Sequence, residues 1–362
     1  MSYHARSCCL VMCGLFAISA PNAGPALAGS PGDRVLASGW NSSNVLGYDE
    51  TGSFTGALLT AGNGVSLAHS LTMGPDGYVY ITSYGTDTVL RYDLKTGTFL
   101  GVFVTAGSGG LNGPSNAVFG PDGRLYVTGL LSNAIHVYSG SDGTTLGTVV
   151  AGLNGAESVL FNNKGNLLLV SGPGNTVLEY DTAGVFQGVF VSPGNGLSNP
   201  HDGVFGPNGG FYLSAFGANK VLAYNGSTGA FLEVLVQDDP GTPGIDESGG
   251  LANAHGLLFG RDSDLYVTSF GSNQVLRYNG TTGDFIEVFI TAGNGLGGAT
   301  DVLFPISGDL DNDGVVGIAD FLNLLGQWGA CPAPCPPGCL ADIDGDCEVG
   351  ILDFLMVLGN WS

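Results

Sequence analysis

Two stretches near the C-terminus place aspartates at the spacing of a calcium-binding loop. They are Gly308–Gly329 (GDLDNDGVVGIADFLNLLGQWG) and Ala341–Ser362 (ADIDGDCEVGILDFLMVLGNWS), which lie 33 residues apart. Calcium takes oxygen ligands, and a 12-residue loop supplies them from positions 1, 3, 5, 7 and 12. We predict one ion per loop, with these ligands: Asp309, Asp311, Asp313, the carbonyl of Val315 and Asp320 in the first, and Asp342, Asp344, Asp346, the carbonyl of Glu348 and Asp353 in the second.

A pair of solvated acidic loops without an ion is the alternative. Four carboxylates in register, found twice, argue against it, because without a cation they would repel one another at short range. Gly314 fits the sharp turn at position 6, although Cys347 replaces it in the second loop. We therefore expect the folding of this segment to depend on calcium.

Three of the five histidines occupy one position of a sequence unit that recurs along the chain. Reading that position through six copies gives His69, Ser115, Glu157, His201, His255 and Thr300. Three imidazoles and a carboxylate suit zinc or another divalent ion, or acid–base catalysis without a metal. The candidate catalytic residues are therefore His255, His201, His69 and Glu157. Histidines that only cap a turn between repeats remain the alternative.

Two further sets of residues belong to the same end of the repeats. The position after the histidine gives Ser70, Asn116, Ser158, Asp202, Gly256 and Asp301, and the position after the second strand of each copy gives Trp40, Tyr84, Leu130, Gly172, Phe216 and Phe270. The aromatic members would stack on a flat ligand such as a sugar, or pack between repeats. The longest insertion, Asp238–Gly250, enters the same face and adds Asp238, Asp239, Asp246 and Glu247.

The elements that must position these residues are short β-strands. In LYVTSFGSNQVLRYNGTTGDFIEVF (265–289), the runs Leu265–Phe270, Val275–Tyr278 and Phe285–Ile290 are rich in β-branched and aromatic residues, and Gly, Asn and Ser separate them. A fourth strand precedes each such group: Ser70–Met73, Asn116–Phe119, Ser158–Phe161, Asp202–Phe205, Gly256–Phe259 and Asp301–Phe304. Most of these lead into a turn of the Gly-Pro-Asp-Gly type.

The repeat predicts an all-β, six-bladed β-propeller. A tyrosine recurs as Tyr48, Tyr92, Tyr138, Tyr180, Tyr224 and Tyr278. A period of about 40–50 residues with four strands per unit is typical of propeller blades, whereas sandwiches do not repeat their turns so regularly. The first copy, from Val35, lacks its leading strand, and the last ends with an unaccompanied strand, Asp301–Phe304. We expect these two ends to complete one blade and so remove the open sheet edges.

These repeats resemble the NHL-like six-bladed propellers, which include the streptogramin lyases and lactonase-type propellers. The resemblance rests on units such as PHDGVFGPNGGFYLS (200–214) and covers about Val35–Pro305. It implies a lyase or hydrolase as one candidate function, with His255-Gly256 matching the Pro-His-Gly context of the lyases' catalytic histidine. Their magnesium-binding glutamates have no match in this sequence. The fold hosts many functions, so the resemblance leaves open whether the chain is an enzyme.

Composition and the N-terminus favour export. Met1–Ala28 has a short positive start, an apolar stretch over Cys8–Ser19 and an Ala-Leu-Ala cleavage site, which predicts a secretory signal peptide cleaved near Ala28. Prolines and glycines interrupt the apolar stretch too early for a membrane span, and Met12 disfavours a lipoprotein at Cys13. With 31 acidic and 9 basic residues, the formal net charge of −22 argues against nucleic acid and anionic membranes as partners.

The remaining cysteines lie in the C-terminal segment. Cys331, Cys335, Cys339 and Cys347 predict two disulfides in an exported protein, with three possible pairings. Their spacing lacks a Cys-x2-Cys pair, which disfavours the alternative of zinc binding. The insert 331–347 would then stabilise a module too small to be stable by its core alone.

The duplicated loop followed by an apolar helix (Phe321–Trp328 and Phe354–Trp361) resembles a type I dockerin over Gly308–Ser362. That resemblance implies a cohesin-like protein partner. Positions 10 and 11, which usually carry small hydroxyl residues facing the cohesin, are here Ile318-Ala319 and Ile351-Leu352.

The sequence as a whole predicts three segments: a signal peptide (1–28), a propeller (33–305) and an α-helical calcium-loop module (308–362). We expect a secreted, monomeric protein whose propeller binds a small-molecule, carbohydrate or protein ligand, within an extracellular polysaccharide-degrading or cell-surface assembly. A metal-dependent propeller lyase or hydrolase is the second interpretation.

Overall fold

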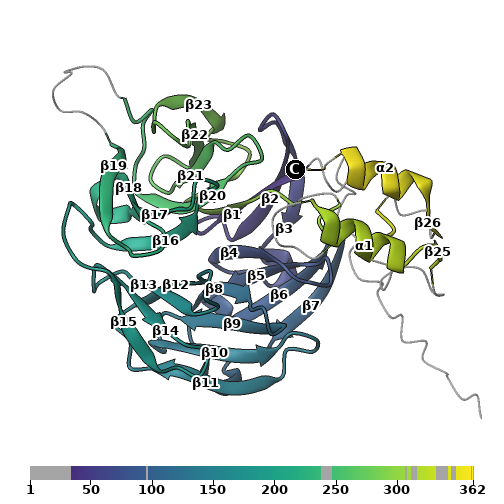
Figure 1. Cartoon of the computed structure of the whole chain (residues 1–362), viewed down its shortest axis with the longest axis horizontal. Coiled ribbons are helices and arrows are strands. Elements are labelled where there is room, and N and C mark those ends of the chain that lie inside the picture. The colour runs from purple at the N-terminus through teal and green to yellow at the C-terminus, as the bar shows by residue number, and fades with distance from the viewer. Residues whose placement is uncertain are drawn as a thin grey trace, which may run out of the picture.

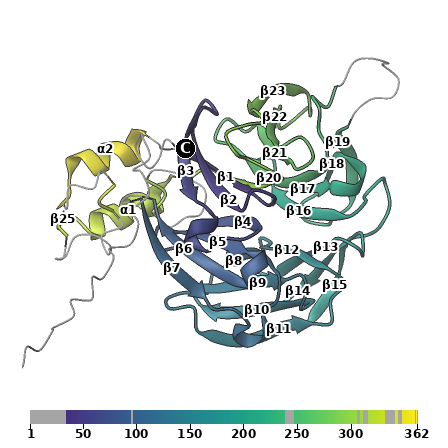
Figure 2. The same cartoon turned by 180° about the vertical axis from the view of Figure 1, so that it is seen from behind.

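The fold is a six-bladed β-propeller with two short helices outside the ring (Figures 1 and 2). The computed structural model describes residues 34–94, 97–237, 247–305, 308–310, 316–331, 341–343, 348–359 and 361. Among these residues, no helix has the length and apolar character needed to cross a membrane. The propeller and its closure were predicted correctly.

Each blade is a four-stranded antiparallel sheet whose strands run in chain order from the channel outward, the closing blade excepted. The five uninterrupted blades are β4 (Ala68–Met73), β5 (Val79–Ser83), β6 (Thr88–Asp93) and β7 (Thr98–Val104); β8 (Pro114–Phe119), β9 (Arg124–Gly129), β10 (Ala134–Ser139) and β11 (Thr145–Ala151); β12 (Ala156–Phe161), β13 (Leu167–Ser171), β14 (Thr176–Tyr180) and β15 (Phe186–Val191); β16 (Pro200–Phe205), β17 (Gly210–Ala215), β18 (Lys220–Asn225) and β19 (Phe231–Val236); and β20 (Ala254–Phe259), β21 (Leu265–Ser269), β22 (Gln274–Tyr278) and β23 (Phe285–Ile290). Four 3₁₀ turns, η2 (Ala61–Asn63), η3 (Tyr84–Thr86), η4 (Ser108–Gly110) and η5 (Phe216–Ala218), lie in the connections.

The two ends of the propeller sequence share the closing blade. It joins β24 (Ala299–Leu303) to β1 (Arg34–Gly39), β2 (Asn44–Asp49) and β3 (Phe54–Leu59). Strands β1 and β24 are antiparallel, with Leu36 opposite Leu303 and Ser38 opposite Asp301. The Ser38 and Thr300 hydroxyls are 2.8 Å apart across this seam. Pairing of β24 with β1 therefore leaves no inner sheet edge unpaired at the junction.

The core lies between neighbouring blades. One buried cluster joins Leu36 and Val45 of the closing blade to Ala68, Val79 and Ile81 of the next. Equivalent clusters recur around the ring. Because both faces of each sheet are covered in this way, the strands read as continuous apolar runs.

The Gly-Pro-Asp-Gly turns at 74–77 and 120–123, and the related Gly-Arg-Asp-Ser turn at 260–263, are anchored through their aspartates. Tyr80, Tyr126 and Tyr266 donate their hydroxyl protons to Asp76, Asp122 and Asp262 at 2.7, 2.9 and 2.9 Å. Each tyrosine lies in the strand that follows the turn (β5, β9 and β21), so the hydrogen bond ties the turn to that strand. Burial and these hydrogen bonds raise the pKa of all three tyrosines, that of Tyr126 to about 12.

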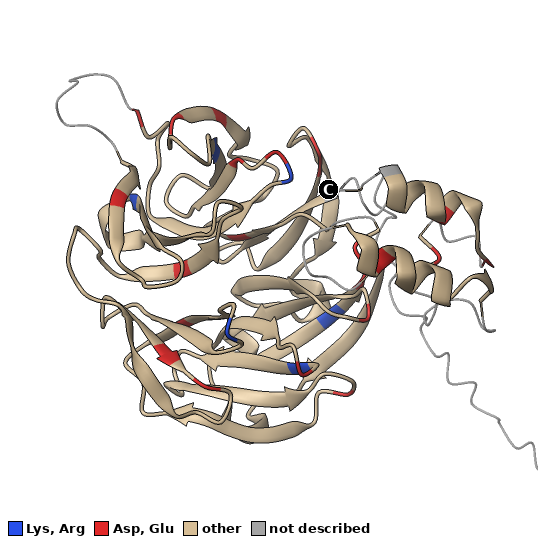
Figure 3. Cartoon of the chain, viewed as in Figure 1, with Lys and Arg blue, Asp and Glu red and all other residues tan. Residues whose placement is uncertain are grey.

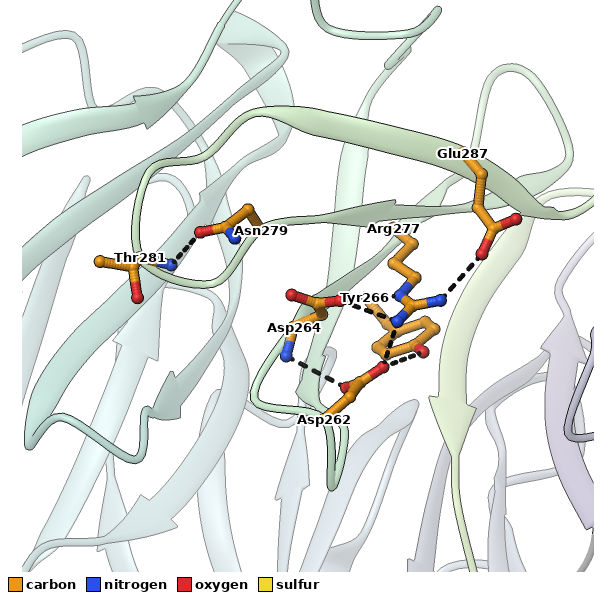
Figure 4. A network of polar contacts seen from close by, with 7 residues as sticks. All are labelled: Asp262, Asp264, Tyr266, Arg277, Asn279, Thr281 and Glu287. Carbon is orange, nitrogen blue, oxygen red and sulfur yellow. Dashed lines mark hydrogen bonds and ion pairs between the residues drawn. The ribbon is translucent and has the colours of Figure 1, made fainter.

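An arginine extends this contact in the blade of β20–β23 (Figure 4). Arg277 on β22 pairs with Asp262 at 2.7 Å, Asp264 at 2.9 Å and Glu287 at 3.0 Å. Its guanidinium also lies 5.7 Å from the ring centroid of Tyr266, a cation–π distance. The network joins a turn to strands β21, β22 and β23. Acidic residues outnumber basic residues in the chain as a whole (Figure 3).

The C-terminal segment has one small core of its own. Helix α1 (Ile318–Gly326) and helix α2 (Ile351–Gly359) are accompanied by the paired strands β25 (Gly329–Ala330) and β26 (Glu348–Val349). The buried residues of this core are Leu310, Val316, Leu324, Ala341, Ile343, Val349 and Val357. Both helices begin three residues earlier and end two residues earlier than predicted, so our helix limits of Phe321–Trp328 and Phe354–Trp361 were wrong. Asp320 explains the earlier start of α1, because it accepts the backbone amide of Gly317, which caps the helix.

Candidate functional site at the channel mouth

The predicted ring of side chains lines one cavity where the six inner strands meet. The cavity encloses about 220 Å³, part of it open to solvent. Two residues from each inner strand line it: His69 and Ser70, Ser115 and Asn116, Glu157 and Ser158, His201 and Asp202, His255 and Gly256, and Thr300 and Asp301. The sequence register therefore placed both sets of residues correctly at the channel.

A β-bulge in every inner strand positions these residues. The pairing of β4 with β5 skips from Ala68 to Leu71, and that of β12 with β13 skips from Ala156 to Ser158. The other four inner strands have register shifts at the equivalent place. We predicted that the histidine position lies just before the strand, which was wrong: each inner strand begins earlier, and the bulge turns its extra residue toward the channel.

Three imidazoles converge on one side of the cavity. His69, His201 and His255 each offer a ring nitrogen, and these three atoms lie within 4.8 Å of one another. The ring centroids of His255 are 4.9 Å from those of His69 and 4.5 Å from those of His201. Burial lowers the pKa of His69 to about 3 and that of His201 to about 4, and burial together with the neighbouring imidazoles lowers the pKa of His255 as well. All three rings are therefore neutral at physiological pH, and each has one nitrogen that carries a lone pair.

Backbone groups of the neighbouring inner strands lie close to two of these rings. Ser115 partly offsets the lowering of the pKa of His69, and Thr300 does the same for His255. Asn199 Nδ2 lies 3.0 Å from His201 Nε2. A histidine that donates one ring N–H to a carbonyl has its other nitrogen unprotonated, which is the arrangement found around metal-ligating imidazoles.

Three buried polar atoms at the mouth have no hydrogen-bond partner. They are Glu157 Oε2, His201 Nδ1 and His255 Nδ1. The side chains of Glu157 and His255 are only 5% exposed, and burial raises the pKa of Glu157 to about 7. Buried groups of this kind are costly unless a water molecule or a ligand satisfies them.

A second layer of polar side chains holds the blades together below the imidazoles. Asp202 accepts the backbone amide of Leu257 at 3.0 Å, and Asp301 accepts that of Leu71 at 2.8 Å. Asn116 accepts the amide of Val159 at 3.3 Å in the same way. Each contact crosses from one inner strand to the next. Burial raises the pKa of both aspartates, and the charge of Asp202 adds to the rise at Asp301.

Aromatic residues cover only part of the mouth. Phe216 stacks on His201 with centroids 4.3 Å apart, and Phe270 stacks on His255 at 6.1 Å. Trp40 meets His69 edge-to-face at 5.4 Å and lies 4.7 Å from Tyr84. The predicted aromatic set thus adjoins the histidines, whereas Leu130 and Gly172 hold its two remaining positions.

In the C-terminal segment, the residues at positions 1 and 12 of each loop are described. Asp320 and Asp353 are 1% exposed, and Asp342 is 2% exposed. Asp320 accepts the amides of Leu310 and Gly317, and Asp353 accepts those of Ile343 and Gly350. Both loops therefore turn their last carboxylate inward in the same way, which suits calcium but also caps the helices. Asp309 and Glu348 belong to the described residues too.

Several predicted residues lie outside the described residues. These are the signal peptide (1–28), Asp311, Asp313, Val315, Asp344 and Asp346 of the calcium loops, Cys335, Cys339 and Cys347, and Asp238, Asp239 and Asp246 of the long insertion. The calcium ligand set, the disulfides and secretion remain predictions.

The sequence analysis missed an exposed apolar surface on the two helices. Four positions are exposed in both copies, 33 residues apart: Ile318 and Ile351, Leu322 and Leu355, Leu325 and Leu358, and Trp328 and Trp361. Leu352 is exposed as well. The i, i+4, i+7 spacing on each helix was visible in the sequence, but we described the helices only as apolar and predicted no exposed face. We call these nine residues the helical apolar surface.

No family model and no curated protein matches the chain. Solved structures share its fold. A chain from a nidogen–laminin complex aligns with a TM-score of 0.58 at 14% identity, over 74% of this chain and 97% of that chain. A streptogramin B lyase aligns with a TM-score of 0.53 at 18% identity, over 76% and 86%. The virginiamycin B lyase of Staphylococcus aureus gives 0.50 at 17% identity, over 75% and 88%. The propeller is thus structurally similar to streptogramin B lyase propellers, and at these identities the similarity concerns the fold alone.

Proposed function

We propose that the chain is a secreted binding protein that presents a ligand site at the mouth of its propeller and attaches to a partner protein through a calcium-dependent, dockerin-like C-terminal module. The helical apolar surface carries this proposal. Soluble proteins rarely leave large apolar side chains exposed in a contiguous set unless another molecule covers them. Here the set is duplicated at the same 33-residue spacing as the aspartate loops.

The chemistry of this surface defines the partner. The two isoleucines at loop position 10, Ile318 and Ile351, are 63% and 60% exposed. A cohesin-like partner must therefore offer an apolar surface there, in place of groups that hydrogen-bond to hydroxyls. An extracellular polysaccharide-degrading or cell-surface assembly is the setting that such a module serves.

The first experiment tests docking with the full mature chain. Surface plasmon resonance should detect binding to an immobilised cohesin domain in calcium and none after chelation. Leu322→Asp combined with Leu355→Asp should weaken binding at least tenfold. Leu232→Asp, at a propeller residue that is 58% exposed, is the matched control and should bind like the parent. Calcium-independent binding, or no binding to any cohesin class, would contradict the docking proposal.

A second candidate function is a metal-dependent propeller enzyme, a lyase or hydrolase acting on lactone or polysaccharide-derived substrates. The convergence of three neutral imidazoles favours it, because imidazole nitrogen is a preferred ligand of zinc and related divalent ions. Its site would comprise His69, His201, His255 and Glu157.

Metal analysis tests this second function. The purified protein should contain about one zinc-class ion per chain. The double variant His201→Ala, His255→Ala should lose it while still binding calcium. A parent protein that contains and binds calcium only would exclude a metal-dependent enzyme at the mouth.

A further inference from the structure

The channel mouth is divided into two unlike halves. Around the ring, the inner strands follow the order β24, β4, β8, β12, β16 and β20. The imidazoles come from β16, β20 and β4, on either side of Thr300. Glu157 comes from β12, and Ser115 comes from β8. Glu157 is not part of the group of ligand atoms within 4.8 Å, which contains only the three histidines.

The aromatic side chains around the mouth are distributed unevenly in the same way. Trp40, Phe216 and Phe270 contact the imidazoles, and Tyr84 contacts Trp40. Leu130 and Gly172 stand in the half that contains Glu157. A Cβ at Gly172 would lie 2.8 Å from Glu157 Oε1, so a larger side chain there would press on the carboxyl group.

Both parts of the mouth contain unpartnered atoms. His255 Nδ1 is in one part and Glu157 Oε2 in the other, and both residues line the same cavity. Glu157 is outside the group of ligand atoms within 4.8 Å, so we assign it no direct bond to an ion that the three histidines hold. A water molecule bound to that ion would reach further, because it adds one coordination bond and one hydrogen bond to the span.

Three protein ligands also leave a coordination position open. Zinc sites with three protein ligands keep a fourth position for water or substrate, whereas structural sites are closed by four. Each neutral imidazole has one nitrogen with a lone pair, which is the form that such a site needs. In this structure no fourth histidine, cysteine or carboxylate among the described residues joins the cluster.

We propose that His69, His201 and His255 hold one zinc-class ion with an open fourth position, and that a water molecule on this position donates a hydrogen bond to Glu157 Oε2, which makes the mouth a hydrolytic site. This inference rests on the second candidate function and decides between its two reaction types. It also assigns separate roles: the histidines are ligands, and Glu157 is the proton acceptor.

The chemistry balances without a further reactant. Glu157 takes one proton from the metal-bound water, whose O–H bond breaks. The resulting hydroxide attacks the carbonyl carbon of an ester or lactone and forms a new C–O bond. The bond from that carbon to the alkoxy oxygen then breaks, and Glu157 returns its proton to the leaving oxygen. The sum is ester plus water giving acid plus alcohol.

The test uses the full mature chain with cobalt(II) as a probe of the ion. Cobalt in a four-coordinate nitrogen–oxygen site absorbs visible light strongly, and its spectrum shifts when a bound water loses a proton. Glu157→Gln should keep a stoichiometry of one ion and the four-coordinate spectrum, but should move the pH midpoint of the spectral shift by more than 0.5 unit. Asp202, Asp301 and Tyr84 also titrate near the cavity and are unchanged in this comparison. Zinc-loaded Glu157→Gln should hydrolyse 4-nitrophenyl acetate at least 100-fold more slowly than the parent, in line with loss of a general base, which contributes about 10²–10⁴-fold.

Glu179→Gln is the matched control, since Glu179 lies on β14 of the same blade and contacts Asn162 and Asn166 rather than the mouth. Glu179→Gln should match the parent in ion stoichiometry, in the pH midpoint of the cobalt spectrum and in the rate of ester hydrolysis. A spectral midpoint unchanged in Glu157→Gln, or ester hydrolysis equal in parent and variant, would overturn the role of Glu157. Absence of cobalt binding would overturn the metal site itself, while leaving the docking proposal intact.

Discussion

Burial decides the protonation of the side chains at the channel mouth. The imidazoles lose their charge because desolvation lowers their pKa values, and Glu157 keeps its proton to about pH 7 because desolvation raises its pKa. The mouth is therefore close to neutral in a protein whose formal net charge is −22. A neutral, half-apolar site suits uncharged ligands or a divalent ion, which agrees with both proposed functions.

Glu157 should make the stability of the metal-free propeller depend on pH. The folded state favours the neutral acid, whereas the unfolded chain ionises near pH 4.5, so folding takes up a proton between pH 4.5 and 7. Stability therefore falls as the pH rises through this window, and the loss persists above it. Glu157→Gln should be more stable than the parent by about 2–3 kcal/mol at pH 8 and by little at pH 4.5. Urea unfolding at both pH values measures the difference.

Glu179→Gln is a control for which we expect the opposite change in stability. Burial raises the pKa of Glu179, but hydrogen bonds from Asn166 and Asn162 outweigh this and lower it overall. Its charged form is therefore the one that the fold favours, and the substitution should destabilise the propeller at neutral pH. If Glu157→Gln were equally destabilising at pH 8, the burial of a protonated Glu157 would be wrong.

At the scale of the element, the bulge in each inner strand marks the limit of what the sequence predicted. The period of the tyrosines and the repeated turns predicted the blades, and the shared register of the repeats predicted which residues line the channel mouth. The bulges carry no composition signal of their own, because His69, Ser115 and Glu157 have nothing in common except position. The direction of their side chains, and the hydrogen bonds to the next blade, depend on tertiary contacts that a single sequence does not show.

The helices show the opposite limitation. Their apolar periodicity was plain, but a module of two nine-residue helices has too little interior to bury every apolar face. Leu324 and Val357 fill its core, and Leu322 and Leu355 are left outside. Periodicity predicts an apolar face, whereas the size of the module decides whether that face is covered by the chain itself.

The outer turns of the blades contain glycines that the neighbouring blade requires. A Cβ on Gly283, whose φ is +75°, would overlap the carbonyl oxygen of Leu235 in the preceding blade. Gly123 has nearly the same φ, +72°, but faces open space. Gly283→Ala should therefore destabilise the propeller by about 1–3 kcal/mol more than Gly123→Ala, because only the former adds a steric overlap to the backbone strain. Chemical denaturation of both variants measures this difference, and equal losses would show that the blades separate easily at this contact.

At the scale of the whole molecule, the ring is held by contacts that cross between residues far apart in the chain. Thr300 bridges the seam to Ser38 and also donates to the carbonyl of Ala68 at 3.0 Å. Asp301 binds the amide of Leu71 on the next inner strand. Closure through β24 therefore contributes both the innermost strand of the closing blade and part of the channel wall. The histidine cluster adjoins this strand, because Thr300 and Asp301 line the same cavity as His255.

Two truncations test this dependence. Ending the chain after Pro305 removes only the C-terminal module, and the propeller should melt at the same temperature as in the full chain, since its blades and channel are intact. Ending it after Gly297 also removes β24, which exposes the edge of β1 and withdraws the contacts of Thr300 and Asp301. The loss of a buried strand approaches the total stability of a domain, about 5–15 kcal/mol, so we expect aggregation through the free edge or no cooperative transition. Differential scanning calorimetry and size-exclusion chromatography of the two proteins compare these outcomes. A cooperative, monomeric propeller ending at Gly297 would show that the remaining strands close the ring without β24, and that the position of His255 does not depend on the seam.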